Sequence, residues 1–399
     1  MQVRRVLALL IAIFFVSVAT PVVAQRNNDS TKQPARSAQE QADIQALVQT
    51  VEIALLSDVG ITVPPPGSPP PATPPAAKPL TLGAADKTSG EVPISWDSNH
   101  FVKGQTDTYI PFTLQLDKST LPSGAALWVR IVTADQAAAF ASMVTTPAKP
   151  ANNNNRNQAP PARTTFAWDN GSFVDVPDGG KLQRAVQLRP GQYVAYIAVK
   201  EKGAAAAGSN QRNDRNRNDR NAAPPAPAAG KVGLLRHEIT VPDYGQGDLT
   251  TSSVIVARSV EQVAAPPADQ ESNPYVFGPM RIVPSPDGKF GKSAELGVIF
   301  WIYGAQAAAS GKPDVTIDYN FYQKMGDSEK YFNKTAPQNL NAQTLPPEFS
   351  VAAGHQLPGS LVVPLTSFPA ADYRLEIKIT DKASGKSVTQ NVNFTVLPV

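Results

Sequence analysis

A stretch of strictly alternating residues near the C-terminus constrains the fold of this chain more than any other feature. Over residues 373–380 (YRLEIKIT), apolar side chains alternate with charged or polar ones. Residues 381–386 form a polar turn that contains Gly385, and residues 388–396 alternate again. Alternation with a period of two is typical of half-buried strands. We therefore predict that residues 368–396 form the closing hairpin of an antiparallel sandwich.

The same pattern occurs a second time around Tyr193. There the sequence LRPGQY leads into the alternating run VAYIAVK, and a return strand ends at residues 239–241. Tyr193 and Tyr373 both follow a turn at the head of a strand. In immunoglobulin-like sandwiches a tyrosine at this place bonds back to nearby backbone, whereas the alternative is an ordinary core tyrosine. The sequence thus predicts an all-β fold of two immunoglobulin-like or fibronectin-III-like antiparallel sandwiches in tandem.

We place the first sandwich at residues 81–242 and the second at 275–399, with a connecting strand and linker at 243–274. Aligned in this way, the turn 381–386 of the second module corresponds to a much longer segment of the first. Two insertions, near 137–163 and 202–230, are rich in Asn, Ala, Pro and Arg. Because they contain almost no aromatic residues, we predict that both insertions are disordered.

Residues 1–24 have the features of a secretory signal peptide. Arg4 and Arg5 precede an apolar run over residues 6–19, and small residues lead to a cleavage position after Ala24. The competing interpretation, a membrane anchor, requires about 20 apolar residues, and a Thr-Pro pair ends this run earlier. The prediction is an exported chain without an integral membrane span after cleavage.

A polar segment and an amphipathic helix are expected over residues 25–61. Ser37 and Glu40 match a capping box, apolar residues recur at helical spacing, and Gly60 follows as a stop signal, so the helix should cover about 38–57. It either docks on its own protein or stays loosely attached to it, or it serves as a helix for self-association or for binding a partner. The Pro-rich linker 62–80 should be an extended, stiff spacer that holds the body away from this helix.

Composition excludes several classes of function. The chain has 399 residues, a net charge of +3 and no cysteine. No disulfide, thiolate nucleophile or Cys-based metal site is therefore possible. The small net charge argues against a nucleic-acid partner. An exported protein without cysteine suits a bacterial envelope, so we expect a periplasmic, outer-surface-associated or extracellular location.

Three stretches resemble a known group of proteins. They are residues 290–298 (FGKSAELGV), residues 249–257 (LTTSSVIVA), and the Pro-Gly-x-Tyr strand with its DKASGK hairpin. They are similar to the β-sandwich regions of bacterial secreted proteins that carry a GWxTD motif or a von Willebrand A-type domain, over about residues 91–399. Neither the GWxTD motif nor the metal-binding DxSxS motif occurs in this sequence. The resemblance implies the fold and the compartment, and it assigns no functional residue.

The sequence contains no recognisable catalytic, metal-binding or cofactor-binding motif. His100, His237 and His355 are far apart, and His237 shares a strand face with apolar residues, which favours a partly buried structural role. We therefore predict no catalytic, metal or cofactor-binding residue, no cofactor, and no enzymatic activity.

Two features leave a binding function open. The segment 210–221 is rich in Arg and Asn and is either a tolerated, solvated insertion or a contact with an anionic surface polymer. Trp96, Trp128 and Trp168 would favour glycan binding if they shared an exposed surface. Three classes of function remain: a structural or interaction protein of the envelope, a glycan- or surface-binding module, and an enzyme whose site sequence order hides. The first class is favoured, with another envelope protein or a surface polymer as partner.

Overall fold

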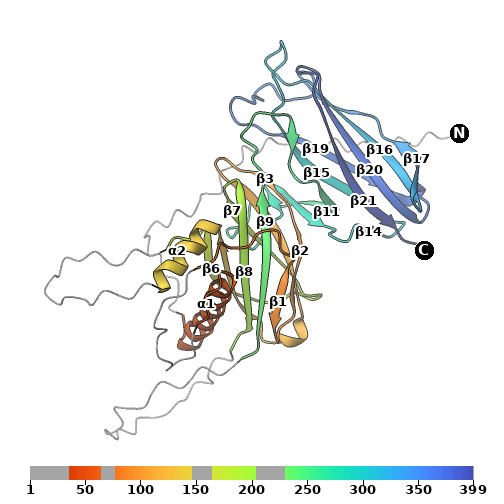
Figure 1. Ribbon diagram of the computed structural model, residues 1–399. Coiled ribbons are helices and arrows are strands. Elements are labelled where there is room, and N and C mark those ends of the chain that lie inside the picture. The colour runs from red at the N-terminus through yellow and green to blue at the C-terminus, as the bar shows by residue number, and fades with distance from the viewer. Residues whose placement is uncertain (1–35, 64–76, 146–163, 204–229, 399) are drawn as a thin grey trace, which may run out of the picture. The chain divides into compact units, whose positions relative to one another are not determined.

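The structure is a computed structural model that describes residues 36–63, 77–145, 164–203 and 230–398 (Figure 1). It is mostly β, with several antiparallel sheets and two helices, and it divides into two compact units at residues 243/244. The predicted signal peptide 1–24, most of the Pro-rich tract and the Arg/Asn-rich segment 210–221 lie outside the described residues.

The N-terminal unit contains two facing sheets. One has the order β2-β4-β3, with β7 also paired to β4, and the other has the order β1-β9-β8-β5-β6. Their interior is one apolar cluster with contributions from both sheets, including Phe112, Leu127 and Ile197. The strands are β1 (Lys87–Gly90), β2 (Ile94–Asn99), β3 (Val102–Lys103), β4 (Thr108–Leu116), β5 (Ala125–Val132), β6 (Trp168–Val174), β7 (Lys181–Leu188), β8 (Gly191–Glu201) and β9 (Val232–Val241), with a 3-10 turn at Lys118–Thr120.

The C-terminal unit also contains two sheets around one apolar cluster. One has the order β10-β15-β11-β13-β12 with β19 on β15, and the other has the order β14-β21-β20-β16-β17 with β18 on β16. The strands are β10 (Thr250–Thr251), β11 (Ile255–Gln262), β12 (Val276–Phe277), β13 (Met280–Pro284), β14 (Lys289–Phe290), β15 (Glu295–Tyr303), β16 (Val315–Met325), β17 (Ser328–Lys334), β18 (Gln338–Leu340), β19 (Leu357–Pro364), β20 (Ala371–Asp381) and β21 (Ser387–Val396), with a 3-10 turn at Leu365–Ser367.

The two units repeat one arrangement of strands. The order β9-β8-β5-β6 in the first matches β21-β20-β16-β17 in the second, and β2-β4-β7 matches β11-β15-β19. The hairpin β8–β9 corresponds to β20–β21, so the equivalence predicted from Tyr193 and Tyr373 is confirmed. The first hairpin is interrupted between residues 201 and 232, where the second needs only residues 382–386.

The two tyrosine hydroxyls make the predicted backbone bonds. Tyr193 donates to the carbonyl oxygen of Arg189 at 2.9 Å, and Tyr373 donates to that of Pro369 at 2.9 Å. Both rings are almost fully buried. Each bond joins the strand to the turn that precedes it. Breaking the bond would leave a buried hydroxyl without a partner, which costs free energy, so the bond stabilises the turn.

The predicted N-terminal helix is confirmed as α1 (Ala38–Asp58). Ser37 accepts a bond from the Glu40 amide and Glu40 accepts one from the Ser37 amide, which completes the capping box. Gly60 follows with a φ of 78°, a conformation that favours glycine.

The prediction that a stiff spacer holds this helix away from the body is wrong. Helix α1 packs on the N-terminal unit, as described below, and the Lys78 amide donates to the carbonyl oxygen of Val59 at 2.8 Å. The chain just before the Pro-rich tract and the chain near the end of the tract therefore lie side by side. The composition of the tract indicated extended backbone, but it could not predict that the residues on either side of the tract contact each other.

The first predicted insertion, 137–163, begins with regular structure instead. Helix α2 (Ala134–Thr145) has Thr133 as a cap for the Gln136 amide, and it buries Ala137, Phe140 and Ala141. The alanine-rich sequence ADQAAAFASMVT has high helix propensity and an apolar spacing of three and four, so a helix is physically reasonable. Residues 146–163 lie outside the described part of the chain.

The region 243–274, predicted to be a connecting strand and a linker, supplies strands to the C-terminal unit. Residues 250–251 (β10) and 255–262 (β11) both pair with β15. Ile255 and Ala257 are fully buried there, which explains why this run is a strand of the sheet. After the exposed Glu295, residues 296–303 of strand β15 are apolar and buried on both faces, as predicted for residues 297–303.

Candidate binding surface

The two units differ in what lies on the outer face of the corresponding sheet. In the N-terminal unit, α1 crosses the outer face of the sheet that contains β5, β8 and β9 (Figure 1). In the C-terminal unit, the face formed by β17, β16, β20 and β21 carries no helix among the described residues. We call this second surface the open face.

Helix α1 contributes an apolar stripe to the covered face. Leu47, Val51 and Leu55 are fully buried in a cluster that also contains Val194 and Tyr196 of β8. Successive residues of β8 therefore point alternately into the sandwich and toward the helix. This observation confirms the interpretation that α1 docks on its own protein.

Each acidic residue of α1 is paired with a cation of the sandwich. The four pairs are Glu40 with Lys202 at 3.7 Å, Asp43 with Lys200, Glu52 with Arg130 at 3.4 Å, and Asp58 with Arg236 at 2.8 Å. The side chains of Lys200, Arg130 and Arg236 are at most 5% exposed. Helix α1 contains no Lys or Arg, so its charge is complementary to the surface it covers.

Two of these cations belong to larger buried networks. Arg130 also bonds to Asp169 through two nitrogens, at 2.9 and 3.0 Å, and lies 4.2 Å from the ring centre of Phe166. Arg236 is the second cation, and its partner Asp58 also accepts a bond from the Tyr196 hydroxyl at 2.8 Å. Burial raises the pKa of Tyr196 above the ordinary value. These contacts hold the helix in a single place, so the covered face offers no surface to a ligand while α1 is docked.

The open face is polar. Buried and outward positions alternate along residues 315–322 of β16 and 372–381 of β20, and the fully buried ones include Leu375, Ile377 and Ile379. The faces predicted for this hairpin are thus confirmed. The outward side chains are Thr316, Asp318, Asn320, Tyr322 and Lys324 of β16, Glu329, Tyr331 and Lys334 of β17, Asp372, Arg374, Glu376, Lys378 and Thr380 of β20, and Thr389, Asn391, Asn393 and Thr395 of β21.

A network centred on Arg374 connects the four strands of the open face. Its guanidinium bonds to Glu329 of β17 at 2.8 Å, to Glu376 of its own strand at 3.2 Å, and to Asn391 of β21 at 2.7 Å. It also lies 4.3 Å from the ring centre of Tyr322 on β16. The bond from Arg374 lowers the pKa of Glu329, and the same bond raises that of Arg374. Both groups are therefore charged at neutral pH, and the network holds their side chains in place.

Tyr331 is the one exposed aromatic side chain of the described residues, at 51%. Its ring lies edge-on to Tyr322, with 5.9 Å between the ring centres. The other aromatic rings are buried or half-buried. The open face therefore combines one accessible ring with an ordered set of hydrogen-bonding groups.

The three tryptophans considered as a sugar-stacking platform do not share an exposed surface. Trp96 stacks between Phe112 and His237 at the interior of the N-terminal unit. Trp168 packs against the same interior cluster. Trp128 faces α1 on the opposite side of the sheet, and its indole donates to Asp169 at 2.9 Å.

The three histidines are also separate. His237 is 18% exposed and its Nδ1 lies 2.7 Å from Asp86, which agrees with the predicted partly buried structural role. Burial lowers the pKa of His100 to about 4. The Ser350 amide donates to Nδ1 of His355 at 3.1 Å. No two of them meet with a carboxylate in a catalytic arrangement within the described chain.

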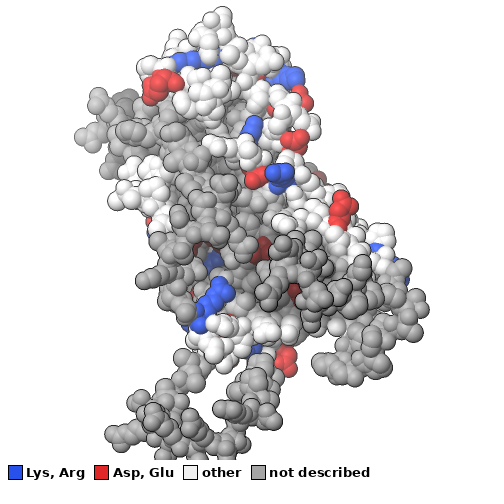
Figure 2. All heavy atoms as spheres, turned by 90° about the vertical axis from the view of Figure 1, so that its left-hand side faces the viewer, with Lys and Arg blue, Asp and Glu red and all other residues white. Residues whose placement is uncertain are grey.

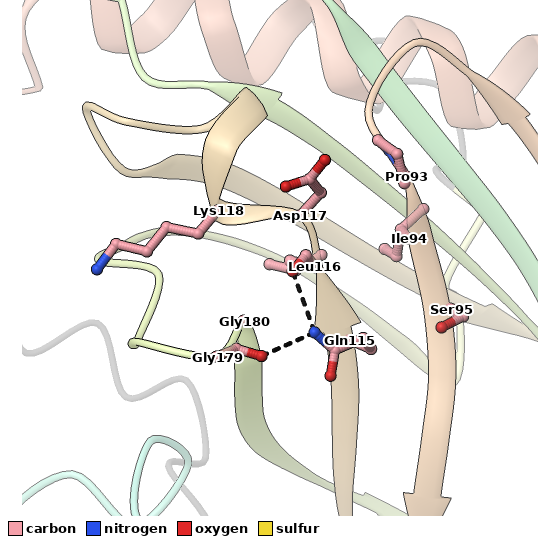
Figure 3. Close-up of a pocket in the computed structure, with 9 residues that line it drawn as sticks. All are labelled: Pro93, Ile94, Ser95, Gln115, Leu116, Asp117, Lys118, Gly179 and Gly180. Atoms are coloured by element: carbon pink, nitrogen blue, oxygen red, sulfur yellow. Dashed lines mark hydrogen bonds between the residues drawn. The ribbon is translucent and has the colours of Figure 1, made fainter.

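A shallow hollow of about 490 Å³ lies at one end of the N-terminal sandwich (Figure 3). It is lined by parts of β2 and β4 and by the turn before β7. The Gln115 amide donates to the carbonyl oxygens of Gly179 at 2.8 Å and Leu116 at 3.3 Å, so the polar group that points across it is already bonded. Nothing in this lining forms an acid–base pair.

Within the described residues, no group of three or more acidic or histidine side chains is arranged to hold a metal ion. The same residues contain no helix that is long and apolar enough to cross a membrane. On the face drawn in Figure 2, described basic and acidic side chains are scattered without an extended patch of one sign.

The fold and these surfaces define a mostly β protein of two multi-sheet units, with one sheet face covered by a helix and one open. No family model matches the sequence, and no curated protein matches it. Among solved structures, the chain is similar to the crystal structure of trypsin-activated alpha-2-macroglobulin from Escherichia coli, at 9% identity and a TM-score of 0.21. That match covers 77% of this chain and 17% of that one, and at this TM-score it carries no argument.

Proposed function

We propose that this chain is a non-catalytic interaction protein of a bacterial envelope, built from two immunoglobulin-like or fibronectin-III-like sandwiches. The arrangement of strands supports this assignment of the fold. In each unit a sheet with three equivalent strands, β2-β4-β7 in the first and β11-β15-β19 in the second, faces a sheet in which the closing hairpin is followed by two further strands. A tyrosine at the head of the first hairpin strand bonds to the turn before it, as in the tyrosine corner of such sandwiches.

The observation that carries the proposal is the contrast between the two outer sheet faces. The same face of the same fold holds a charge-matched helix in the N-terminal unit, whereas in the C-terminal unit none of the described helices lies on it. Together with Trp, Tyr and Arg are enriched among the few residues that dominate the binding energy of protein–protein interfaces. The open face presents both, in Tyr331 and Arg374, supported by neighbouring side chains.

A non-catalytic role is supported by the structural hydrogen bonds and ion pairs that the buried charged groups make. The buried cations of the N-terminal unit hold α1, and buried Asp381 accepts bonds from the amides of Gln306 and Ala383, which order the last hairpin turn. Enzyme sites usually contain titratable groups gathered in a cleft with strongly shifted pKa values. His100, the histidine with a strongly lowered pKa, lies beside the backbone of β4 instead.

The exported location rests on the predicted signal peptide at residues 1–24. The partner is then a component of the envelope, either another protein or a surface polymer.

The test is co-sedimentation of the mature chain with isolated bacterial envelopes. A face variant, Thr389→Glu with Asn393→Glu, adds two charges at exposed positions of the open face and leaves the core intact. The control, Gln45→Glu with Gln49→Glu, adds the same charge at exposed positions of α1. We expect the wild type and the control to sediment with envelopes and the face variant to remain in solution. Equal sedimentation of all three proteins, or of none, would contradict the proposal.

A further inference from the structure

We infer that the open face binds a neutral polysaccharide, with the ring of Tyr331 stacking on one sugar and the side chains around Arg374 bonding to the hydroxyl groups of its neighbours. This inference rests on the proposed function and names the class of partner for the same surface.

The charge of the open face argues against a polyelectrolyte. Its outward residues include four Lys or Arg and four Asp or Glu, so the formal charges cancel. Oppositely charged residues are also neighbours, such as Asp318 beside Lys378 and Arg374 beside Glu376. Association with a highly charged polymer depends on a surface potential of one sign. A neutral ligand has no such requirement.

The lack of an apolar centre argues against a protein partner. The central part of a protein–protein interface is depleted of charged residues and more apolar than the remaining surface. On the open face the centre is instead the Arg374–Glu376 pair with Asn320 and Asn391 on either side. A flat protein surface placed there would bury this charged network, which costs free energy. Sugar hydroxyl groups can donate to the carboxylate and amide oxygens and accept from the amide nitrogens.

The side chains are ordered before any ligand arrives. Arg374 has contacts to three other strand positions and to the Tyr322 ring, and Asn320 donates to Glu376 at 3.4 Å. Side chains held by such neighbours lose little conformational entropy on binding. Tyr331 lies beside this network and presents a ring that is half exposed. An aromatic ring favours an apolar CH-rich surface, which the face of a sugar ring provides.

The spacing between strands of the open face is similar to the spacing between sugars in an extended polysaccharide. Adjacent strands lie about 4.8 Å apart, which is close to the length of one pyranose unit. The register places Tyr331, Tyr322, Arg374 and Asn393 in one row across four strands. A polysaccharide chain running across the strands along this row would meet one side chain for each sugar.

The experiment is affinity electrophoresis of the full mature chain in gels that contain a neutral soluble polysaccharide, using dextran, a mixed-linkage β-glucan and a mannan in separate gels. The variants are Tyr331→Ala, Tyr331→Phe and Arg374→Lys. Tyr331 is exposed, so neither of its variants should affect folding, and thermal unfolding verifies this. We expect at least one polysaccharide to retard the wild type and Tyr331→Phe equally. Tyr331→Ala should bind roughly 3- to 10-fold more weakly, since one aromatic contact contributes about that factor.

Arg374→Lys keeps the charge but removes the planar fork that bonds to three partners at once. We expect it to weaken binding as well, whereas a surface that recognised charge alone would tolerate it.

Several results would overturn the inference while leaving the proposed function in place. One is envelope sedimentation that is lost after protease treatment of the envelopes but not after digestion of their polysaccharides, which would indicate a protein partner. Another comes from a further gel that contains an anionic polysaccharide, run at low and at high salt: retardation in that gel alone, and only at low salt, would indicate recognition by charge. Retardation that is equal in wild type, Tyr331→Ala and Arg374→Lys would place the glycan site elsewhere.

Discussion

Adjacent residues of strand β20 have opposite roles. Ile377 is fully buried between the sheets of the C-terminal unit, and Lys378 is exposed on the open face. The sequence already predicted this difference, because alternation in a strand assigns each residue to one face.

We predict that Ile377→Asp unfolds the C-terminal unit, because an unpaired buried charge costs several kcal/mol, a large share of the stability of a domain. Lys378→Ala should change the free energy of unfolding by less than about 0.5 kcal/mol. Denaturant unfolding of the two variants measures both effects. Equal shifts of the two midpoints would show that the faces are reversed.

His100 gives the N-terminal unit a dependence on pH. Its folded-state pKa is about 4, below the unfolded value of 6.5, because burial disfavours the charged ring. The folded state therefore binds fewer protons than the unfolded state between these two values. The contribution of His100 to stability is fully present above pH 6.5 and is lost as the pH falls through about 4.

We predict that the free energy of unfolding of wild type falls by up to about 3 kcal/mol between pH 6.5 and 4 through this residue. Since carboxylates also titrate near the lower end, the informative quantity is the difference from His100→Asn, which should show a flatter profile. Parallel profiles for the two proteins would mean that His100 is as hydrated in the folded state as in the unfolded state.

At the scale of elements, the parts that follow local rules were predictable. The hairpin β20–β21 follows from alternation, and α1 follows from a capping box, an apolar stripe and a glycine stop. Helix α2 was missed because Asn-rich sequence after it biased the whole stretch toward disorder. The docking surface of α1 could not be predicted, since its partners Arg130, Lys200 and Arg236 come from three strands far away in the sequence.

The sequence predicted the part of the candidate binding surface that lies on β20, but not the part that lies on β17. Alternation placed Arg374, Glu376 and Lys378 outward, but strand β17 with Tyr331 has too few apolar residues for a strand signal. Only the pairing with β16 brings Tyr331 and Glu329 next to Tyr322 and Arg374.

The docking of α1 depends on its buried ion pair more than on its exposed one. Lys200 and Asp43 are both buried, and Asp43 also accepts from the Gly203 amide at 3.0 Å. Lys202 and Glu40, one turn away, form a pair that is partly in water. Removing one partner of a buried pair leaves an uncompensated charge, whereas an exposed pair contributes little.

We predict that Lys200→Met destabilises the N-terminal unit by about 3 kcal/mol and that Lys202→Met, the matched control, changes its stability by less than about 0.5 kcal/mol. The double variant Lys200→Met with Asp43→Leu should recover much of the loss, because no unpaired charge remains. Urea unfolding gives the three values. A Lys200→Met variant as stable as the control would show that α1 is not held by this pair.

The long connection between β8 and β9 should be dispensable for folding. The C-terminal unit makes the equivalent hairpin with residues 382–386, so the fold needs no long loop there. Loop closure costs only about 0.6 kcal/mol per doubling of length. We predict that replacing residues 204–229 by a short Gly-containing turn leaves the thermal midpoint unchanged or slightly raised.

In the other insertion, 137–163, helix α2 limits how many residues can be removed. Removing residues 146–163 should be tolerated for the same reason, but a deletion that extends into 138–145 removes buried Phe140 and Ala141 of α2. We expect that larger deletion to lower the midpoint clearly. A tolerated loss of 138–145 would contradict a structural role for α2.

At the scale of the whole molecule, one fold is used twice with two different outcomes. The N-terminal unit covers the outer face of its hairpin sheet with an acidic helix from its own chain, and within the described part of the chain no helix covers the corresponding face of the C-terminal unit. Both hairpins have the same strand lengths and the same bond from a tyrosine hydroxyl to the preceding turn. The difference therefore lies in the side chains of the outer face, which are Val194, Tyr196 and Ala198 in one unit and Arg374, Glu376 and Lys378 in the other. The apolar face requires a cover, and the polar face does not.

The most direct test of the claim that the open face makes the external contact is hydroxyl-radical footprinting of the full mature chain, with and without sonicated bacterial envelopes. Tyr331, 51% exposed, reports on the open face, and Met143, 45% exposed on α2, reports on the N-terminal unit. We predict that envelopes lower the oxidation of Tyr331 and leave that of Met143 unchanged. Protection of Met143 without protection of Tyr331, or no protection of either, would contradict the account.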